Sequence, residues 1–239
     1  MKLLITILFL SATIFAQTLR YKVKAPLFGT IGEINVNYST GVSSYNISAN
    51  MHTFGFAKKM SGNRIEQYKV NGTIKHGKYY AKHYIQDTSY NNKKSHLEYI
   101  FNYRSKKIIK LRKNWKDAKL IRDTKRALKY FTYNDLFSIY HNIIYDLKNK
   151  PAGWYQVQVA GLEHTGGYLK IKIPTISQQK QEAKSLGVKN VWIFHIITNK
   201  AIMKSKNGEI VFAVGKDGIA KAVRVLNIPF VSHLDGILQ

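Results

Sequence analysis

Strict alternation of apolar and polar side chains dominates the first half of this sequence. In residues 34–38, Ile, Val and Tyr alternate with two asparagines, and residues 45–51 repeat the pattern with Tyr, Ile, Ala and Met. Side chains two positions apart lie on the same face of a β-strand. The Ser-Thr-Gly segment at residues 39–41 separates the two runs. Together these segments predict two half-buried strands joined by a tight turn.

Strand-sized segments separated by turn residues continue along most of the chain. Further strands are predicted over residues 64–75, 78–90, 97–103, 108–115, 118–125, 155–159, 169–173, 191–197, 210–214, 219–226 and 229–238. No interior linker rich in Pro, Gly and Ser divides them, so we expect a single β-rich domain over residues 17–239. A sheet with this many strands must curl, close or pair with a second sheet. The predicted fold is mainly β, one curved antiparallel sheet that is half-barrel or barrel-like.

Two segments have helical rather than strand spacing. The main helix is predicted at about residues 134–146, where Leu136, Ile139, Tyr140, Ile143 and Ile144 recur at helical intervals. Asn134 or Asp135 can cap its start. We expect this helix to plug an open end of the sheet or to lie across its concave face. A second, short helix is predicted at about residues 177–186, and a single helical turn near residues 53–59.

The first sixteen residues have the layout of a cleavable signal peptide. Met1 and Lys2 give a positive start, residues 3–15 are almost wholly apolar, and Ala16 is a small residue at the cut. Thirteen apolar residues are few for a helix that must cross a bilayer core of ~30 Å, although an uncleaved anchor is the alternative. The sequence has no cysteine, which closes the lipoprotein route. We therefore expect a periplasmic protein of a Gram-negative cell, delivered without a lipid anchor.

The formal charge of +25 favours anionic partners. Export argues against nucleic acid and leaves anionic phospholipid, lipid A or peptidoglycan, although the lysines could also simply serve solubility. Residues 104–129 are the densest basic segment, with twelve Lys and Arg against two Asp. On a strand, Lys110 and Arg112 share one face, and with Lys116 they are predicted to form a solvent-facing stripe that contacts anionic headgroups. The alternative is a charged edge that blocks aggregation.

The aromatic content, sixteen Tyr and eleven Phe, offers a second candidate site. We predict that a curved sheet places one group of aromatic side chains around an apolar or amphipathic ligand, with the tyrosine hydroxyls at the mouth. This group comprises Tyr38, Tyr45, Tyr99, Phe101 and Tyr103. The alternative is that these side chains form a filled core.

Signatures of catalysis or metal binding are weak. No two histidines lie four residues apart with a nearby acid, and His76 and His83 are expected to face opposite sides of a strand. Asp135, His141 and Asp217 could form an acid–base site on paper, but the first is better explained as a helix cap and the last as a turn residue. The sequence contains no Gly-x-Ser-x-Gly motif and no phosphate-loop spacing. We expect no catalytic residues, no metal and no cofactor.

The C-terminal segment carries a resemblance to a known family. Residues 212–218 (Phe-Ala-Val-Gly-Lys-Asp-Gly), 222–225 (Ala-Val-Arg-Val) and 236–238 (Gly-Ile-Leu), with Pro229, resemble the end of a family of exported bacterial proteins catalogued only as a domain of unknown function. Residues 135–140 resemble its mid-chain Asp-x-x-Ser-x-Tyr helix. Phe212 replaces the expected tryptophan, and Pro229 falls late in the pattern. The resemblance implies a periplasmic, mainly antiparallel β fold, similar in style to the half-barrels of lipoprotein carriers, and it supplies no catalytic residues.

The functional hypothesis is therefore a non-enzymatic periplasmic protein. It is expected to bind an apolar or amphipathic envelope component, or an anionic membrane surface, with at most peripheral membrane contact. Two alternatives stay open. One is a structural or protein-interaction module of the cell envelope that uses an exposed sheet edge, and the other is a hydrolase of envelope polymer.

Overall fold

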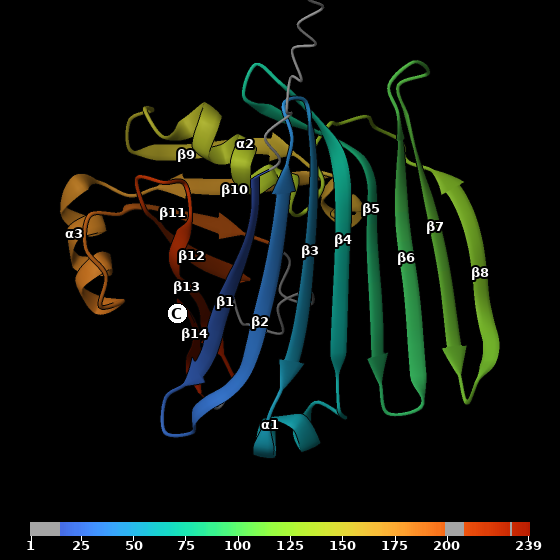
Figure 1. Ribbon diagram of the computed structural model, residues 1–239, viewed down its shortest axis with the longest axis horizontal. Helices are drawn as coiled ribbons and strands as arrows, with labels where there is room; N and C mark the ends of the chain where they lie inside the picture. The colour runs from blue at the N-terminus through green and yellow to red at the C-terminus, as the bar shows by residue number, and fades with distance from the viewer. Residues whose placement is uncertain (1–14, 199–207, 230) are drawn as a thin grey trace, which may run out of the picture.

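Fourteen strands form one antiparallel sheet across the described residues, 15–198, 208–229 and 231–239 of the computed structural model (Figure 1). The strands are β1 (Phe15–Ala25), β2 (Gly29–Thr40), β3 (Ser44–Thr53), β4 (Ile65–Lys75), β5 (Lys78–Tyr90), β6 (Lys93–Asn102), β7 (Lys107–Lys116), β8 (Lys119–Ala127), β9 (Gly153–Gln158), β10 (Tyr168–Ile173), β11 (Trp192–Ile197), β12 (Glu209–Val214), β13 (Ala220–Ile228) and β14 (Ser232–Leu238). Their order is β8-β7-β6-β5-β4-β3-β2-β1-β14-β13-β12-β11-β10-β9. The mainly β, antiparallel prediction is confirmed, and the sheet is not closed.

The sheet consists of two wings that meet where β1 pairs with β14. The register at this junction runs from Tyr21 opposite Leu238 to Lys24 opposite Asp235. The first wing, β1–β8, contains the longer strands, and the second wing comprises β9–β14. In Figure 1 the strands of the first wing run up and down the view, whereas β9 and β10 run across it. The sheet therefore curls, as a sheet of this size must.

Tight turns between the long strands follow from the local sequence. His76 and Gly77, between β4 and β5, both have positive φ, at 49° and 78°. Asp117 and Ala118, between β7 and β8, likewise have φ of 50° and 61°. Two consecutive positive φ values match the twist of the flanking strands in a two-residue hairpin. His76 is therefore a turn residue.

Helix α2 (Ser138–Leu147) lies between the two wings. Its residues Ile139, Ile143 and Leu147 pack against β9–β12, while Tyr140 and the preceding Phe137 pack against the aromatic face of the first wing. The helix thus lies across the inner face of the sheet, one of the two expected positions. It begins later than predicted because Asp135 Oδ1 accepts the N–H groups of Phe137 and Ser138, at 2.7 and 3.1 Å, and so caps a turn that precedes the helix.

Residues 128–137, which we call the strap, connect β8 to α2 and bridge the two wings. The Tyr133 carbonyl accepts the N–H of Ala81 on β5 at 3.1 Å. On the other side, Thr132 Oγ1 donates to the carbonyl of Gln158 on β9 at 2.7 Å, and the Asn134 carbonyl accepts the N–H of Ala160 at 2.9 Å. The barrel-like shape is therefore held on this side by the strap, since β8 and β9 do not pair.

Two further helices lie outside this interior. Helix α3 (Ile176–Ser185) covers the outer face of β11–β14, where Leu186, Ile193 and Val211 form a separate buried cluster. Thr175 and Gln178 form a capping box at its start. Helix α1 (Gly55–Met60) links β3 to β4 at the lower end of the first wing in Figure 1. Among the described residues, no helix has the length and apolarity needed to cross a membrane.

Most of the predicted signal peptide lies outside the described residues. Residues 1–14 are not described, whereas Phe15 and Ala16 begin β1 and pair with Thr40 and Ser39 of β2. The cut after Ala16 stays a prediction. Cleavage there would shorten β1 by two residues and leave the rest of its ladder with β2 in place.

Candidate functional site

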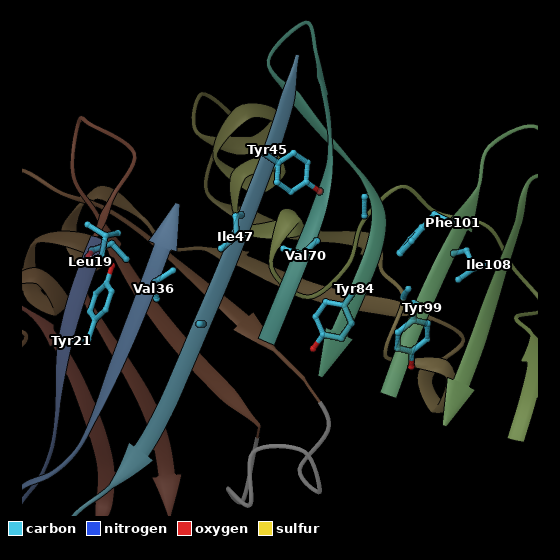
Figure 2. Close-up of a cluster of buried hydrophobic side chains, with 14 residues drawn as sticks. Leu19, Tyr21, Val36, Tyr45, Ile47, Val70, Tyr84, Tyr99, Phe101 and Ile108 are labelled. Carbon is cyan, nitrogen blue, oxygen red and sulfur yellow. Dashed lines mark hydrogen bonds between the residues drawn. The ribbon is translucent and has the colours of Figure 1, made fainter. Parts of the chain in front are cut away.

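The predicted aromatic site lies mostly on the inner face of the first wing. Tyr45, Tyr99 and Phe101 are buried, and Figure 2 shows them projecting from β3 and β6 in one cluster with other apolar side chains. Tyr38 is partly buried and meets the His141 ring of α2 edge-on, with ring centroids 5.5 Å apart. All four side chains belong to, or pack against, one buried cluster to which Phe131 and Phe137 of the strap and Tyr140 of α2 also contribute. A ligand at this place would therefore have to displace α2 or the strap.

Tyr103 lies apart from the other four predicted residues. It follows the end of β6, and its hydroxyl donates to the Ala81 carbonyl at 2.6 Å. Its ring meets Phe131 of the strap edge-on, with centroids 5.5 Å apart. Tyr103 therefore anchors the strap to β5 and does not extend the row formed by Tyr99 and Phe101.

Burial shifts the pKa values of two titratable groups in the interior, Asp135 and His141. Burial raises the pKa of the Asp135 carboxyl, although the N–H groups at the start of α2 partly offset the effect. Burial lowers the pKa of His141 to about 4, so its ring is neutral at pH 7. Asp135 Oδ2 and His141 Nε2 are buried and have no hydrogen-bond partner among the described residues, so the two groups do not bond to each other. Asp217 lies in a turn, ion-paired with Lys221 at 2.6 Å.

The position of Lys110 contradicts the predicted solvent-facing stripe of Lys110, Arg112 and Lys116. Its register opposite Tyr99 places it on the inner face, where it is only 9 % exposed. Its ammonium group donates to Glu163 Oε2 at 2.6 Å and lies 5.2 Å from the centroid of the Tyr99 ring. The prediction that Lys110 faces solvent is wrong because a carboxylate from the other wing compensates its charge inside the fold.

Arg112 and Lys116 complete the account of the predicted stripe. Arg112 lies on the same strand face as Lys110, as expected, but this is the inner face; Arg112 is half-buried there and donates from Nε to Asn114 Oδ1 at 3.3 Å. Lys116 is exposed at the end of β7. The three residues are thus brought to one strand, but only Lys116 is fully available to a surface outside the protein.

A second set of basic residues lies on β8, at the edge of the sheet. All nine residues of β8 are exposed, and this strand has a neighbour on one side only. We define the basic edge as Lys116, Lys119, Arg122, Lys125 and Arg126. Asp123 is the acid within β8, and it lies 3.7 Å from Lys113 of β7. The density of Lys and Arg in residues 104–129 identified this segment, and of the three residues predicted from it, Lys116 belongs to the basic edge.

The histidines considered for a metal site lie apart or in pairs with acids. His83 Nδ1 is 3.1 Å from Glu98 Oε1, and His96 Nδ1 is 2.7 Å from Asp87 Oδ1. Within the described part of the chain, no group of three or more His, Cys, Asp or Glu residues is arranged to hold a metal ion.

Sequence reasoning missed one histidine cluster entirely. The buried His195 of β11 is held between two carboxylates, Glu209 Oε1 at 2.7 Å from Nδ1 and Glu182 Oε2 at 2.8 Å from Nε2. Burial lowers the pKa of His195, but the two carboxylates outweigh this effect and raise it overall. Because one carboxylate lies on each side of the ring, the cluster is a clamp that fixes α3 to the sheet and is not a convergent site.

Comparison with known proteins supports the fold. No family model matches the sequence, and no curated protein matches it. Among solved structures, the chain is similar to the crystal structure of a β-barrel-like protein of domain of unknown function DUF1849 from Brucella abortus, with a TM-score of 0.52 and 11 % identity. The match covers 93 % of this chain and 94 % of that one. At this identity the likeness shows a shared β-barrel-like fold alone.

Proposed function

We propose that this protein is an exported, non-enzymatic protein of the bacterial cell envelope that docks peripherally on anionic lipid headgroups. The observation that carries the proposal is the basic edge, where the exposed strand β8 presents Lys119, Arg122, Lys125 and Arg126 beside one acid. Each basic side chain near an anionic membrane adds roughly 1 kcal/mol of attraction. The predicted signal peptide supports an envelope location.

Vesicle binding tests this function directly. Protein recovered from the periplasmic fraction is expected to bind vesicles of phosphatidylglycerol and phosphatidylcholine at low ionic strength, and salt should weaken the binding. The double change Arg122→Glu and Lys125→Glu should lower the affinity at least about tenfold. The matched control, Lys180→Glu with Lys189→Glu, makes the same change in net charge at exposed positions in α3 and the turn after it. Equal losses in both variants, or no binding to anionic vesicles, would overturn the proposal.

The inner aromatic face supports a narrower version of the same proposal. An amphipathic envelope component could occupy the surface formed by Tyr38, Tyr45 and Tyr99 if the strap moves. Native mass spectrometry of the periplasmic protein, followed by lipid extraction, tests this version. A bound lipid supports it, and a protein that carries no extractable lipid contradicts it.

The unpaired edges support a second candidate function, an interaction module that receives a strand from a partner protein. Among the described strands, none pairs with the outer side of β8, and such edges can pair with an added strand. Crosslinking in cells from position 122 or 125 separates the two functions. Recovery of one protein partner and no lipid favours this second function.

A further inference from the structure

Four large apolar side chains gather, exposed, at one end of the first wing. Leu27 is 100 % exposed in the turn between β1 and β2, and the next residue, Phe28, is also exposed. Phe54 and Phe56 are exposed at the start of α1. The rings of Phe28 and Phe56 are stacked, with centroids 6.3 Å apart and planes 12° apart. We call these four residues the apolar tip, and Figure 1 shows the turn and α1 at the lower end of β1–β3.

The turn at the apolar tip holds a leucine in a backbone conformation that usually requires glycine or asparagine. Leu27 has a φ of 68°, in the left-handed region where glycine or asparagine is usual. A leucine that is fully exposed there gains no packing in return. Contiguous exposed apolar surface commonly marks an interaction site. The combination of strain and exposure therefore indicates that the Leu27 side chain is buried by something outside this chain.

The charges around the apolar tip identify the kind of partner. Residues 22–30 and 54–60 contain four lysines, Lys22, Lys24, Lys58 and Lys59, and no Asp or Glu, although Glu33 and Asp235 lie opposite Lys22 and Lys24 on the neighbouring strands. A second copy of this surface would bring like charges together, which disfavours self-association. Lysines around phenylalanine and leucine instead match an anionic bilayer, in which the ammonium groups meet headgroups and the apolar side chains enter the acyl boundary.

The apolar tip is also continuous with the basic edge along one end of the sheet. Because the strands are antiparallel, the turns β1–β2, β5–β6 and β7–β8 all lie at the same end as α1 (Figure 1). The last two turns and their flanks add Lys93, Lys94, Lys116 and Lys119, together with one acid, Asp117. A flat anionic surface that contacts Lys116 and Lys119 would therefore lie beneath the apolar tip as well.

We infer that the apolar tip inserts into the interfacial layer of an anionic bilayer, while Lys116 and Lys119, at the same end of the sheet, meet the headgroups. The inference rests on the proposed function and names the part of the chain that enters the lipid. Val42 provides an internal contrast, because it is 83 % exposed in the turn between β2 and β3, at the opposite end of the same strands.

The absence of cysteine in the sequence allows a site-specific test. Leu27→Cys and Val42→Cys, each labelled with an environment-sensitive fluorophore, are mixed with phosphatidylglycerol–phosphatidylcholine vesicles that contain a lipid-borne quencher. We expect a blue shift and quenching at position 27 and neither at position 42. The double change Phe28→Ser with Phe56→Ser should weaken vesicle binding about tenfold and leave its salt dependence unchanged, whereas Arg122→Glu with Lys125→Glu should reduce the salt dependence.

The outcomes separate this inference from the proposed function. Salt-sensitive vesicle binding without quenching at position 27, or with equal quenching at position 42, contradicts insertion of the apolar tip but still supports docking through the basic edge. Quenching at position 27 on purely zwitterionic vesicles, unaffected by salt, contradicts both the docking of the basic edge on anionic headgroups and the anionic partner inferred for the apolar tip. Absence of binding to both kinds of vesicle overturns both.

Discussion

Lys110 and Glu163 join the two wings of the sheet through one ion pair. Lys110 belongs to β7, next to the β8 edge, while Glu163 lies in the short 3₁₀ helix η1 (Glu163–Thr165) that follows β9 at the other edge. Lys110 Nζ lies 2.6 Å from Glu163 Oε2, and Tyr99 donates to the second carboxylate oxygen at 2.7 Å. Together with the strap, this ion pair fixes the position of the β8 edge of the sheet relative to the β9 edge.

Removal of the Lys110 charge should destabilise the fold. Lys110→Met leaves Glu163 partly buried without its cation, and we expect a loss of about 2–3 kcal/mol in the free energy of unfolding. The matched control is Lys221→Met, which breaks the more exposed pair with Asp217 at the same 2.6 Å and should cost less than about 1 kcal/mol. Urea unfolding measures both. Equal losses would show that the pair between the wings has no special role.

The same pair predicts a response to acid. Burial raises the pKa of Glu163, but the hydrogen bonds from Lys110 and Tyr99 outweigh it and leave the pKa lowered overall. A lowered carboxyl pKa adds stability above the unfolded-state value, and that stability is lost as the pH falls through the folded-state value. The difference in the free energy of unfolding between the wild type and Lys110→Met should therefore narrow as the pH falls below the ordinary glutamate pKa of 4.5. A difference that stays constant across this range contradicts the assignment.

His141 should make the fold sensitive to mild acid for a different reason. Its folded-state pKa is about 4 against an ordinary value of 6.5, so the unfolded chain binds a proton first as the pH falls. Stability should decline between pH 6.5 and 4, by up to about 3 kcal/mol for this group. His141→Phe retains a ring that can stack on Tyr79, whose centroid lies 4.3 Å away. Thermal melts should show that the melting temperature of His141→Phe rises relative to that of the wild type at pH 4.5 but not at pH 8. A difference in melting temperature that is the same at both pH values would refute the prediction.

The His195 clamp should respond to pH in the opposite sense. Its pKa is raised, so its stabilising contribution is complete below about pH 6.5 and is lost as the pH rises through the folded-state value. Hydrogen exchange of residues 176–185, corrected for the intrinsic rate, should show α3 opening more readily as the pH rises. Glu182→Gln should move this opening to lower pH because one of the two carboxylates is gone. Protection that does not depend on pH would exclude the clamp.

Gly72 should tolerate no side chain. A β-bulge between Asn71 and Gly72 brings the backbone against Tyr45, and a Cβ at position 72 would lie 2.7 Å from Tyr45 Cε1 and collide with the Tyr80 carbonyl oxygen. Gly72→Ala is therefore expected to cost roughly 2–3 kcal/mol. Gly41→Ala is the control, since its nearest neighbour is the flexible Ser44 hydroxyl at 3.3 Å. Equal stability of the two variants in urea would contradict the close approach.

Local patterns predict the strands of this fold well, because alternation and turn residues act over a few positions. Lys110 shows what such local patterns cannot predict. Alternation places Lys110 and Arg112 on one strand face and the apolar Ile109 and Leu111 on the other, so the pattern predicts that Lys110 faces solvent, whereas it is buried. Glu163, 53 residues away, accounts for this burial. His195 and its glutamates, 13 and 14 residues away, likewise meet only after β11, β12 and α3 have packed.

The pairing of β1 with β14 has a consequence for how the chain folds. Every other pairing in the described sheet joins strands that are consecutive in the sequence, so each wing can form from local hairpins. The β1–β14 ladder instead joins residues such as Tyr21 and Leu238, at opposite ends of the described chain. Contacts between residues so distant in sequence form slowly. One edge of β1 therefore stays unpaired until β14, the last strand of the chain, has formed.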